Sequence, residues 1–276
     1  MSMLKLTGWV EVNGQRLTPQ EIEVILQNHP EEVLRFGGKF FFAGHGCRAR
    51  DHFGIMPGNC PKGTLICNDE VKGSIDPTVP DLPLEEAIIT AVGLRSDQGV
   101  CALSGGVDST LVAHLARREC VALGLADSHD LQQARHAADT LGLSCTYVTI
   151  TPAEIAAALP IVIEAIPIKD PVNTSIALAQ YFVARFAGEQ GYQRILTGQG
   201  ADELFGGYSR YLETPTLAED LERDFIGLEL QADREEDRSL LDNDCSLIRT
   251  VPGYWISCTE YSYTSIDIFK VSIDIF

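Results

Sequence analysis

Basic side chains are scarce in this sequence. The 39 acidic residues outnumber the 21 lysines and arginines, which gives a formal net charge of −18 at pH 7 over 276 residues. Only six of the basic residues are lysines: Lys5, Lys39, Lys62, Lys72, Lys169 and Lys270. A surface this acidic repels the phosphates of nucleic acids and is poor in the cations that bind them. We therefore expect small-molecule substrates and no nucleic-acid partner.

Long hydrophobic runs are also absent. No stretch of eighteen apolar residues occurs, so the sequence predicts no transmembrane helix and no membrane partner. The stretch Met1-Ser2-Met3-Leu4-Lys5 lacks the charged and apolar blocks of a signal peptide. We expect a cytoplasmic protein on these grounds. Apolar residues still make up 45% of the chain, which is enough to bury a core.

No two of the eight cysteines form a C-x-x-C pair. They lie at Cys47, Cys60, Cys67, Cys101, Cys120, Cys145, Cys245 and Cys258. In a long chain without a secretion signal, scattered cysteines are expected to be reduced thiols in the core. Three of them, Cys47, Cys60 and Cys67, lie near His45 and His52 and could bind zinc. Their spacing fits no common zinc site, so reduced thiols are the favoured interpretation.

Three zones differ in their local pattern. Residues 1–80 are rich in glycine, aromatic residues and short β-like runs, and they predict a small β-rich region. Three prolines in the segment 76–83 exclude a helix or a central strand there and indicate a linker. Residues 84–241 alternate between helical and strand patterns, and residues 242–276 form a divergent tail.

The middle zone predicts an α/β fold. Helices are expected at 84–94, 109–118, 128–141, 173–187 and 216–241, and strands at 99–103, 121–126, 144–150 and 194–197. The fourth helix is expected to start on an N-cap at Asn173. Such alternation indicates βαβ units, and therefore a parallel sheet with helices on both faces. In the tail, the near-repeats Ser265–Phe269 and Ser272–Phe276 alternate apolar and polar residues, which favours strands.

A glycine-rich turn follows the strand at 99–103. Its central part, Ser104-Gly105-Gly106-Val107-Asp108-Ser109, is called the Ser104–Ser109 loop below. The paired glycines let the backbone approach a ligand closely, and the hydroxyls and N–H groups can form a nest for an anion. The loop has no lysine and places the carboxylate of Asp108 where a phosphate would be repelled. An ordinary Gly-Gly turn, with Asp108 favouring the helix dipole, is the alternative.

A second loop explains how that carboxylate is tolerated. The stretch TGQGADELFGGY, Thr197 to Tyr208, follows another predicted strand. Because the carboxyl ends of parallel strands share one edge of a sheet, Asp108 and Asp202 can face each other there. One or two carboxylates together with phosphate oxygens are typical ligands of Mg²⁺. The sequence thus predicts a Mg²⁺–nucleotide site, with a glycine-rich surface loop carrying helix-capping acids as the alternative.

The two loops resemble those of a known family. The Ser104–Ser109 loop matches the S-G-G-x-D-S motif of PP-loop ATP pyrophosphatases, and Gly198–Tyr208 resembles the G-E-G-x-D-E-x-x-G-G-Y of asparagine synthetases. The resemblance covers roughly residues 84–240 and implies an adenine nucleotide α-hydrolase-like fold. It also implies a reaction: ATP activates the side-chain carboxylate of aspartate, pyrophosphate leaves, and ammonia displaces AMP to give asparagine.

The resemblance assigns roles by position. The residues that would cradle pyrophosphate are Ser104, Gly105, Gly106 and Ser109. Asp108 and Asp202 would hold Mg²⁺ and, with Gln199 and Glu203, form the expected catalytic set; Leu103 and Gly198 would lie against the adenosine. The family usually has glutamate at position 199, where it handles the proton of the attacking ammonia. Glutamine cannot act as a base, so Glu203 or a different nucleophile would be required.

The N-terminal zone resembles part of a second domain of the same family. Arg50–Pro57, RDHFGIMP, resembles the R-D-x-x-G-x-x-P near the end of the class II glutaminase domain. That glutaminase uses an N-terminal cysteine, whereas position 2 here is Ser2 and the first cysteine is Cys47. A hydroxyl is a poorer nucleophile than a thiol at neutral pH. We expect a β-rich remnant that covers one face of the synthetase domain and hydrolyses no glutamine. Free ammonia would be the nitrogen source, and a partner protein could supply it.

Two other functions stay open. A tRNA-modifying PP-loop enzyme is disfavoured because the chain lacks a C-x-x-C pair and a basic surface. A non-catalytic nucleotide-binding module is supported by Gln199 and by the divergent tail. Release of pyrophosphate would separate an enzyme from such a module. The identity of the acceptor, amino acid or tRNA, would separate the two enzymes.

Overall fold

The computed structural model falls into two compact units, of which one ends at Thr90 and the next begins at Ala91. The structure describes residues 3–54, 56, 58–77, 82–166, 169–192, 194–199, 201–220, 248–251, 254–257 and 272–274. No helix in these ranges is both long enough and apolar enough to cross a bilayer. The division into zones at 1–80, 84–241 and 242–276 stays a prediction.

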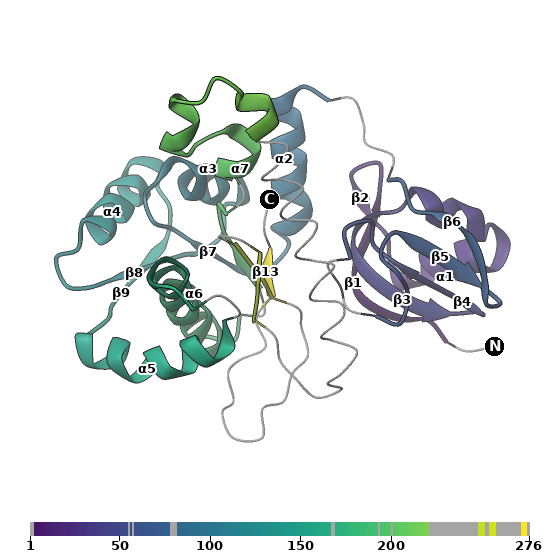
Figure 1. Cartoon of the computed structure of the whole chain (residues 1–276), viewed down its shortest axis with the longest axis horizontal. Coiled ribbons are helices and arrows are strands. Elements are labelled where there is room, and N and C mark those ends of the chain that lie inside the picture. Colours follow the sequence, from purple (N-terminus) through teal and green to yellow (C-terminus); the bar gives the residue numbers. More distant parts are fainter. Residues whose placement is uncertain are drawn as a thin grey trace. The chain divides into compact units, whose positions relative to one another are not determined.

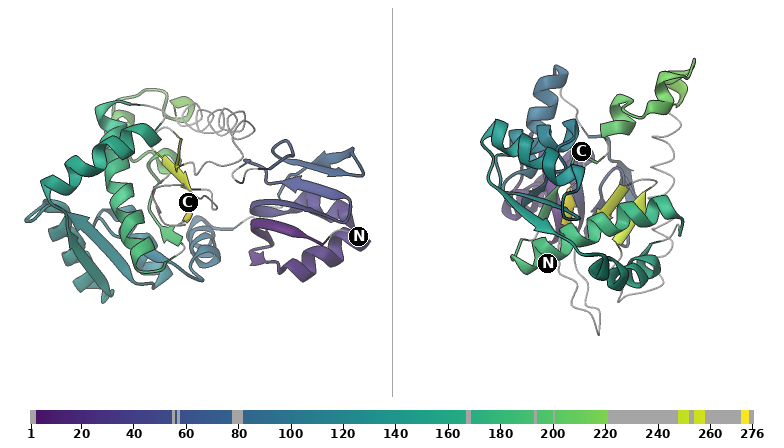
Figure 2. Two further views of the ribbon diagram at one scale, coloured as in Figure 1. Left: turned by 90° about the horizontal axis from the view of Figure 1, so that it is seen from below. Right: turned by 90° about the vertical axis from the view of Figure 1, so that its left-hand side faces the viewer.

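The first unit is an antiparallel sheet with the strand order β2-β1-β3-β4-β5-β6. Its strands are β1 (Lys5–Val12), β2 (Gln15–Arg16), β3 (Gly37–Gly44), β4 (Cys47–Arg50), β5 (Thr64–Cys67) and β6 (Glu70–Ser74). The helix α1 (Pro19–Asn28) lies against one face, followed by the 3₁₀ helix η1 (Pro30–Arg35) (Figure 2). Alternate residues of β3, Phe40 and Phe42, point into the core and meet Ile22 of α1 there. The β-rich region predicted from the sequence is confirmed.

The cysteines of this unit correct the expectation of reduced thiols. Cys47 and Cys67 are cross-strand partners on β4 and β5 and form a disulfide, with their Cα atoms 4.0 Å apart. Closely spaced antiparallel pairs lie within disulfide reach, and sequence spacing does not reveal which residues pair. The pair is therefore not available as zinc ligands, and no metal-binding cluster of three or more residues occurs in the described part of the chain. Cys60, Cys101, Cys120 and Cys145 form no disulfide, whereas Cys245 and Cys258 lie outside the described residues.

The second unit is a five-stranded sheet with the order β13-β10-β7-β8-β9, in which every pair is parallel. Its strands are β7 (Val100–Ala102), β8 (Cys120–Gly124), β9 (Cys145–Thr149), β10 (Arg194–Leu196) and β13 (Ser272–Asp274). Its helices, which cover both faces, are α3 (Val107–Ala116), α4 (His129–Leu141), α5 (Pro152–Ala165) and α6 (Pro171–Glu189) (Figure 1). The helix α2 (Leu84–Arg95) leads into this unit. The predicted α/β fold with a parallel sheet is confirmed.

Two details of the helices differ from expectation. The N-cap of α6 is Asp170 and not Asn173, because the Asp170 carboxylate accepts the backbone N–H of Asn173 at 2.8 Å and Pro171 opens the helix. The helix α5 was not anticipated. It starts on a capping box in which Thr151 and Glu154 each accept the other's backbone N–H. These bonds, with Arg185, lower the pKa of Glu154 to about 2.

The remaining elements follow β10. They are α7 (Ala201–Phe205), the 3₁₀ helix η2 (Ser209–Leu212), and the antiparallel strands β11 (Ile248–Val251) and β12 (Tyr254–Ser257). Residues 217–220 start the helix predicted at 216–241, and the rest of that prediction lies outside the described residues. The near-repeat Ser272–Phe276 contributes β13, and Ser265–Phe269 lies outside the described residues.

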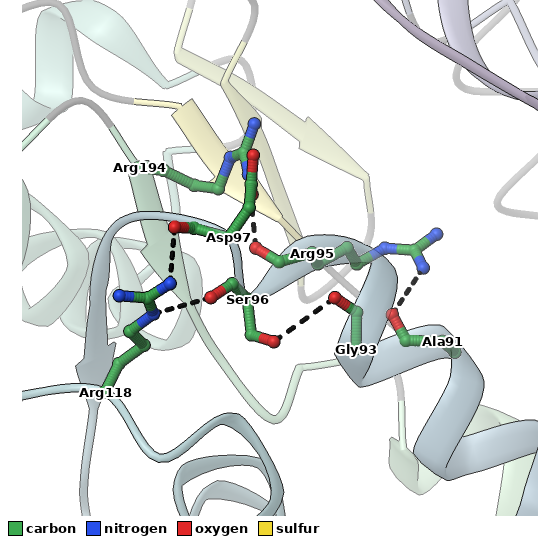
Figure 3. Close-up of polar contacts among 7 residues, drawn as sticks. All are labelled: Ala91, Gly93, Arg95, Ser96, Asp97, Arg118 and Arg194. Carbon is green, nitrogen blue, oxygen red and sulfur yellow. Dashed lines mark hydrogen bonds and ion pairs between the residues drawn. The ribbon is translucent and has the colours of Figure 1, made fainter. Parts of the chain in front are cut away.

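Two arginines at the amino edge of the parallel sheet bind the loop that precedes β7 (Figure 3). Arg118, just before β8, donates to the carbonyls of Ser96 (2.5 Å) and Asp97 in the loop between α2 and β7. Arg194, the first residue of β10, donates to the carbonyl of Arg95 at 3.1 Å and pairs with the Asp97 carboxylate. The loop is thus fastened to two strands at the end opposite to that where the predicted site lies.

Candidate functional site

The two predicted loops leave the sheet side by side. β10 lies next to β7 with Ile195 opposite Val100 and Leu196 opposite Cys101, and the two strands run in the same direction. The Ser104–Ser109 loop therefore starts at the same edge as Thr197 and Gly198. Both stretches follow short strands that are almost wholly buried, which fixes the point at which each loop emerges. The α7 segment that follows β10 lies at this edge in Figure 1.

Serine hydroxyls hold the Ser104–Ser109 loop in shape. Ser109 Oγ accepts the backbone N–H of Ser104 at 3.2 Å and lies 2.9 Å from Ser104 Oγ. Ser104 Oγ also accepts the N–H of Gly106 at 3.4 Å. Gly106 is the N-cap of α3 and has no side chain to cap it. The first turn of α3 thus presents backbone N–H groups to an anion at the helix N-terminus, beside the exposed loop residues Ser104, Gly106 and Val107.

Two glycines allow the close approaches that assemble the site. Gly105 has φ +85°, and a Cβ there would overlap the backbone of Gln133 and Ala134 in α4. A Cβ at Gly198 would lie 2.6 Å from the Ser109 nitrogen and 2.8 Å from the Asp108 Cβ. Such distances are shorter than any normal van der Waals contact, so both positions require glycine. The second loop therefore lies directly on the residues of the first that the sequence assigned to phosphate and metal.

One predicted metal ligand acts electrostatically on the other. Burial raises the pKa of the Asp108 carboxyl above its usual range, and the negative charge of Asp202 raises it further. Asp202 is held by its own segment, since the backbone N–H of Gly207 donates to its carbonyl at 3.0 Å. A Cβ on Gly207 would overlap the Asp202 carboxylate, which is therefore covered closely by that backbone. The fold thus brings the two carboxylates close enough for the charge of Asp202 to act on Asp108.

This arrangement fits a hard divalent cation. Two carboxylates from different loops, next to helix N–H groups that suit phosphate, are the donor set by which proteins hold Mg²⁺ on a nucleotide. A cation between Asp108 and Asp202 would also remove the repulsion that raises the pKa of Asp108. The donor set does not suit zinc or other metals that favour nitrogen and sulfur ligands.

The remaining predicted residues lie around this centre. Leu103 is buried and donates its N–H to the carbonyl of Val121 at 2.9 Å, so its backbone belongs to the sheet edge. Gln199 lies one residue beyond Gly198, and its N–H donates to Thr197 Oγ1 at 3.4 Å. Glu203 lies in α7, and its side chain is outside the described part. Sequence reasoning missed Thr197, a buried polar residue that its place directly after a buried strand could have indicated.

The glutaminase-like motif has a structural role in its own unit. Arg50 is 1% exposed and donates from Nε to the carbonyl of Met56 and from Nη2 to that of Gly54, both at 2.6 Å. Asp51 is fully buried and accepts the N–H groups of Phe40 and Met56. Both side chains therefore fix the segment after β4 within the first unit.

Comparison with known proteins identifies the family of the chain. Residues 84–266 match the family described as asparagine synthase. The chain belongs to the asparagine synthase family. The matched range includes both loops, and the domain is of a ligase family.

Individual relatives are similar over part of their length. A putative glutamine-hydrolysing asparagine synthetase of Methanocaldococcus jannaschii is 36% identical over 136 residues, which are 48% of this chain and 25% of that protein. A probable asparagine synthetase of Dictyostelium discoideum is 29% identical over 181 residues, or 59% of this chain and 31% of that protein. The chain thus spans only about a quarter to a third of these relatives. Among solved structures, an NMN synthetase from Francisella tularensis matches this chain with a TM-score of 0.35 and 21% sequence identity. The match covers 60% of this chain and 76% of that one, and its low TM-score supports no conclusion about function.

Proposed function

We propose that the chain is an ATP-dependent ligase that adenylates the side-chain carboxylate of aspartate, releases pyrophosphate and forms an amide with free ammonia. The observation that carries the proposal is the pair Asp108 and Asp202, brought together from two loops at one sheet edge beside a helix N-terminus. Membership of the asparagine synthase family supports the reaction class.

The first step would be attack of a substrate carboxylate oxygen on the α-phosphorus of ATP. A C–O–P bond forms, the bond from the α-phosphorus to the bridging oxygen breaks, and pyrophosphate leaves with the electron pair. The N–H groups and hydroxyls of Ser104, Gly106 and Ser109 would hold the leaving group. Asp108 and Asp202 would hold Mg²⁺, which when bound neutralises charge developing on the phosphate oxygens. Gly198 would keep the nucleotide against the loop.

The second step would be attack of ammonia on the acyl carbon, with AMP as leaving group and loss of one proton from nitrogen. Gln199 stands where the family has a base, and its amide cannot take that proton. The N–H of Gln199 is fixed by Thr197, so the position itself is held in place. We infer that the second step is slow relative to the first and that Glu203 is the candidate to accept the proton.

Free ammonia is the nitrogen donor that we propose, supplied in solution or by a partner protein. A glutaminase of this family needs a reactive thiol. Cys47 and Cys67 are joined in a disulfide, and Cys60 is buried with its thiol directed at the carbonyl of Thr64 at 3.3 Å. Buried or bonded sulfurs are poor nucleophiles, which supports the absence of glutaminase activity from the described β-rich unit.

Exchange of labelled pyrophosphate into ATP, measured with a panel of carboxylates, tests the proposal. We expect exchange with aspartate that depends on Mg²⁺ and is lost in Asp202→Asn. Asparagine should form with ammonium and not with glutamine. ATP binding without exchange for any carboxylate would contradict the proposal and favour a non-catalytic nucleotide-binding module. Exchange that transfers the activated group only to tRNA would favour the tRNA-modifying alternative.

A further inference from the structure

The sheet of the second unit ends at a strand whose outer edge carries no protection. Strand β9 pairs in continuous register with β8 over all five of its residues, and within the described residues it has a strand on that side only (Figure 1). Its sequence, CTYVT, contains no charge and no proline, and none of the five residues is buried. Residues of this kind favour strands, and an unprotected edge strand is a template for a further strand.

The edges of the first unit's sheet are built differently. At one edge, β2 is only two residues long. At the other, β6 carries Glu70 and Lys72, which pair at 2.7 Å, and its register on β5 shifts between Leu65 and Ile66. Short length, charges and an irregular register are devices by which proteins prevent strands from adding to an edge. β9 has none of the three, so its edge is suited to pairing.

Alternate residues of β9 present their backbone groups to the free edge. Ile150, just after β9, donates its N–H to the Gly124 carbonyl of β8 at 2.8 Å. Because backbone direction alternates along a strand, Cys145, Tyr147 and Thr149 direct their N–H and C=O groups away from β8. An antiparallel copy of the strand with Tyr147 opposite Tyr147 would therefore make reciprocal hydrogen bonds there and bring Cys145 opposite Thr149. The backbone of this edge is complementary to itself.

The charges beside Tyr147 suit the same arrangement. Arg135 of α4 lies over the Tyr147 ring at 4.7 Å, Asp139 follows one helical turn later, and both are exposed. Partial burial and the Cys145 thiol raise the pKa of Tyr147, Asp139 raises it further and Arg135 opposes the rise, so both charges act on this side chain. A twofold axis through Tyr147, perpendicular to the sheet, would make the two α4 helices antiparallel. Arg135 of each copy would then lie opposite Asp139 of the other.

We propose that β9 is the docking edge for a second copy of this chain, which pairs antiparallel with it about a twofold axis through Tyr147 and is held in register by reciprocal Arg135–Asp139 contacts. A second copy is favoured over another partner because the edge is complementary to itself in both backbone pattern and charge. The acid Glu119, which accepts from Thr146 at 3.5 Å, is kept away from its copy because the two lie at opposite ends of the paired strands. The inference goes beyond the proposed function and does not depend on it, since the Ser104–Ser109 loop takes no part.

Sedimentation equilibrium of the full chain across the micromolar range tests the pairing. The wild type should show a monomer–dimer equilibrium. Arg135→Asp and Asp139→Arg should each raise the dimer dissociation constant about tenfold or more, because each places like charges opposite one another twice in the interface. An equimolar mixture of the two variants should form heterodimers of near wild-type stability, since the acids of one α4 then face the arginines of the other. Arg35→Asp, the same change at an exposed residue of η1 in the first unit, is the matched control and should leave the dimer unchanged.

A cysteine at position 149 tests the register. Thr149→Cys should form a disulfide-linked dimer through Cys145 of the second copy when it is oxidised with diamide, because hydrogen-bonded antiparallel partners have Cα atoms about 5.5 Å apart. Within one strand the same two positions lie about 13 Å apart and cannot bond. Thr149→Ser is the matched control and should not cross-link.

Several outcomes would overturn the inference. One is a wild type that stays monomeric, as it would if another segment or another protein covered β9. Others are a dimer that neither charge variant weakens, mixed charge variants that do not pair, and a Thr149→Cys protein that cross-links no more than Thr149→Ser. None of these measurements requires turnover, so they are independent of whether the chain releases pyrophosphate.

Discussion

The two edges of the parallel sheet are built from different residue types. At the amino edge, Arg118 and Arg194 donate to backbone carbonyls, and Arg194 also pairs with the Asp97 carboxylate, which fastens the loop before β7. At the carboxyl edge, glycines bring backbone segments together, and burial and the negative charge of Asp202 raise the pKa of Asp108. The same strands thus end in a stabilising cluster at one end and in a destabilising pair at the other. A pair of like charges kept together at a cost in stability is typical of a functional site.

Removing one charge of the Asp108–Asp202 pair should therefore lower activity and, at Asp108, raise stability. Asp108→Asn and Asp202→Asn are each expected to lower aspartate-dependent pyrophosphate release by roughly 100- to 1,000-fold, because the charge that holds the cation is lost. Asp108→Asn should at the same time melt at a higher temperature than the wild type at pH 7. Pyrophosphate assays and calorimetry on the same preparations check both effects. If a variant loses activity only because it unfolds, the carboxylates have a structural role, and the proposed difference between the two edges is wrong.

The higher melting temperature expected for Asp108→Asn should depend on pH in one direction. The pKa of Asp108 is raised in the folded state, so the folded state binds more protons than the unfolded state between the two pKa values. Stability of the wild type therefore falls as pH rises through that window. The advantage of Asp108→Asn should be present above the folded pKa of Asp108 and disappear below about pH 4, near the pKa of an unfolded aspartate. An equal difference in melting temperature at pH 4 and pH 7 would contradict this account.

Substitution of Gln199, also at the carboxyl edge, tests the second chemical step alone. Gln199→Glu should raise the rate of asparagine formation about 100-fold by restoring a base, with little change in pyrophosphate release. In the wild type we expect pyrophosphate release to exceed asparagine formation. The two products are measured in one reaction with ammonium as the nitrogen source. If the wild type already couples them one to one and Gln199→Glu changes neither, the proton is handled elsewhere, and Glu203 is the residue to test.

Much of the fold could be predicted because local patterns and topology agree. Alternation of helix and strand indicated the parallel sheet, and the rule that parallel strands share a carboxyl edge predicted that the two loops would meet. Two helices were missed although their start signals are local. Thr18 and Thr151 are each followed by proline and, three residues on, by glutamate, which is a capping box.

Other features depend on contacts that no local pattern specifies. The Cys47–Cys67 disulfide follows from the register of β4 on β5, whereas Cys101 and Cys120 are also register partners but lie on parallel strands and remain thiols. Sequence spacing cannot distinguish these two cases. The contacts of Arg210 with the rings of Tyr208 and Tyr211 likewise depend on the burial of Tyr211, which no local pattern specifies.

The amino edge should show the smallest effect on activity. Arg194→Met removes the pair with Asp97 and the hydrogen bond to the carbonyl of Arg95, and should lower the free energy of unfolding by about 1.5–3 kcal/mol, the range for hydrogen bonds to a charged group. KM for ATP and aspartate should stay unchanged. Arg185→Met is the matched control, because Arg185 also pairs with carboxylates but is more exposed, so its loss should matter less. Urea unfolding and steady-state kinetics give both quantities. A rise in KM for ATP in a folded Arg194→Met protein would show that the edges are coupled through β10, and that the division between a stabilising and a functional edge is wrong.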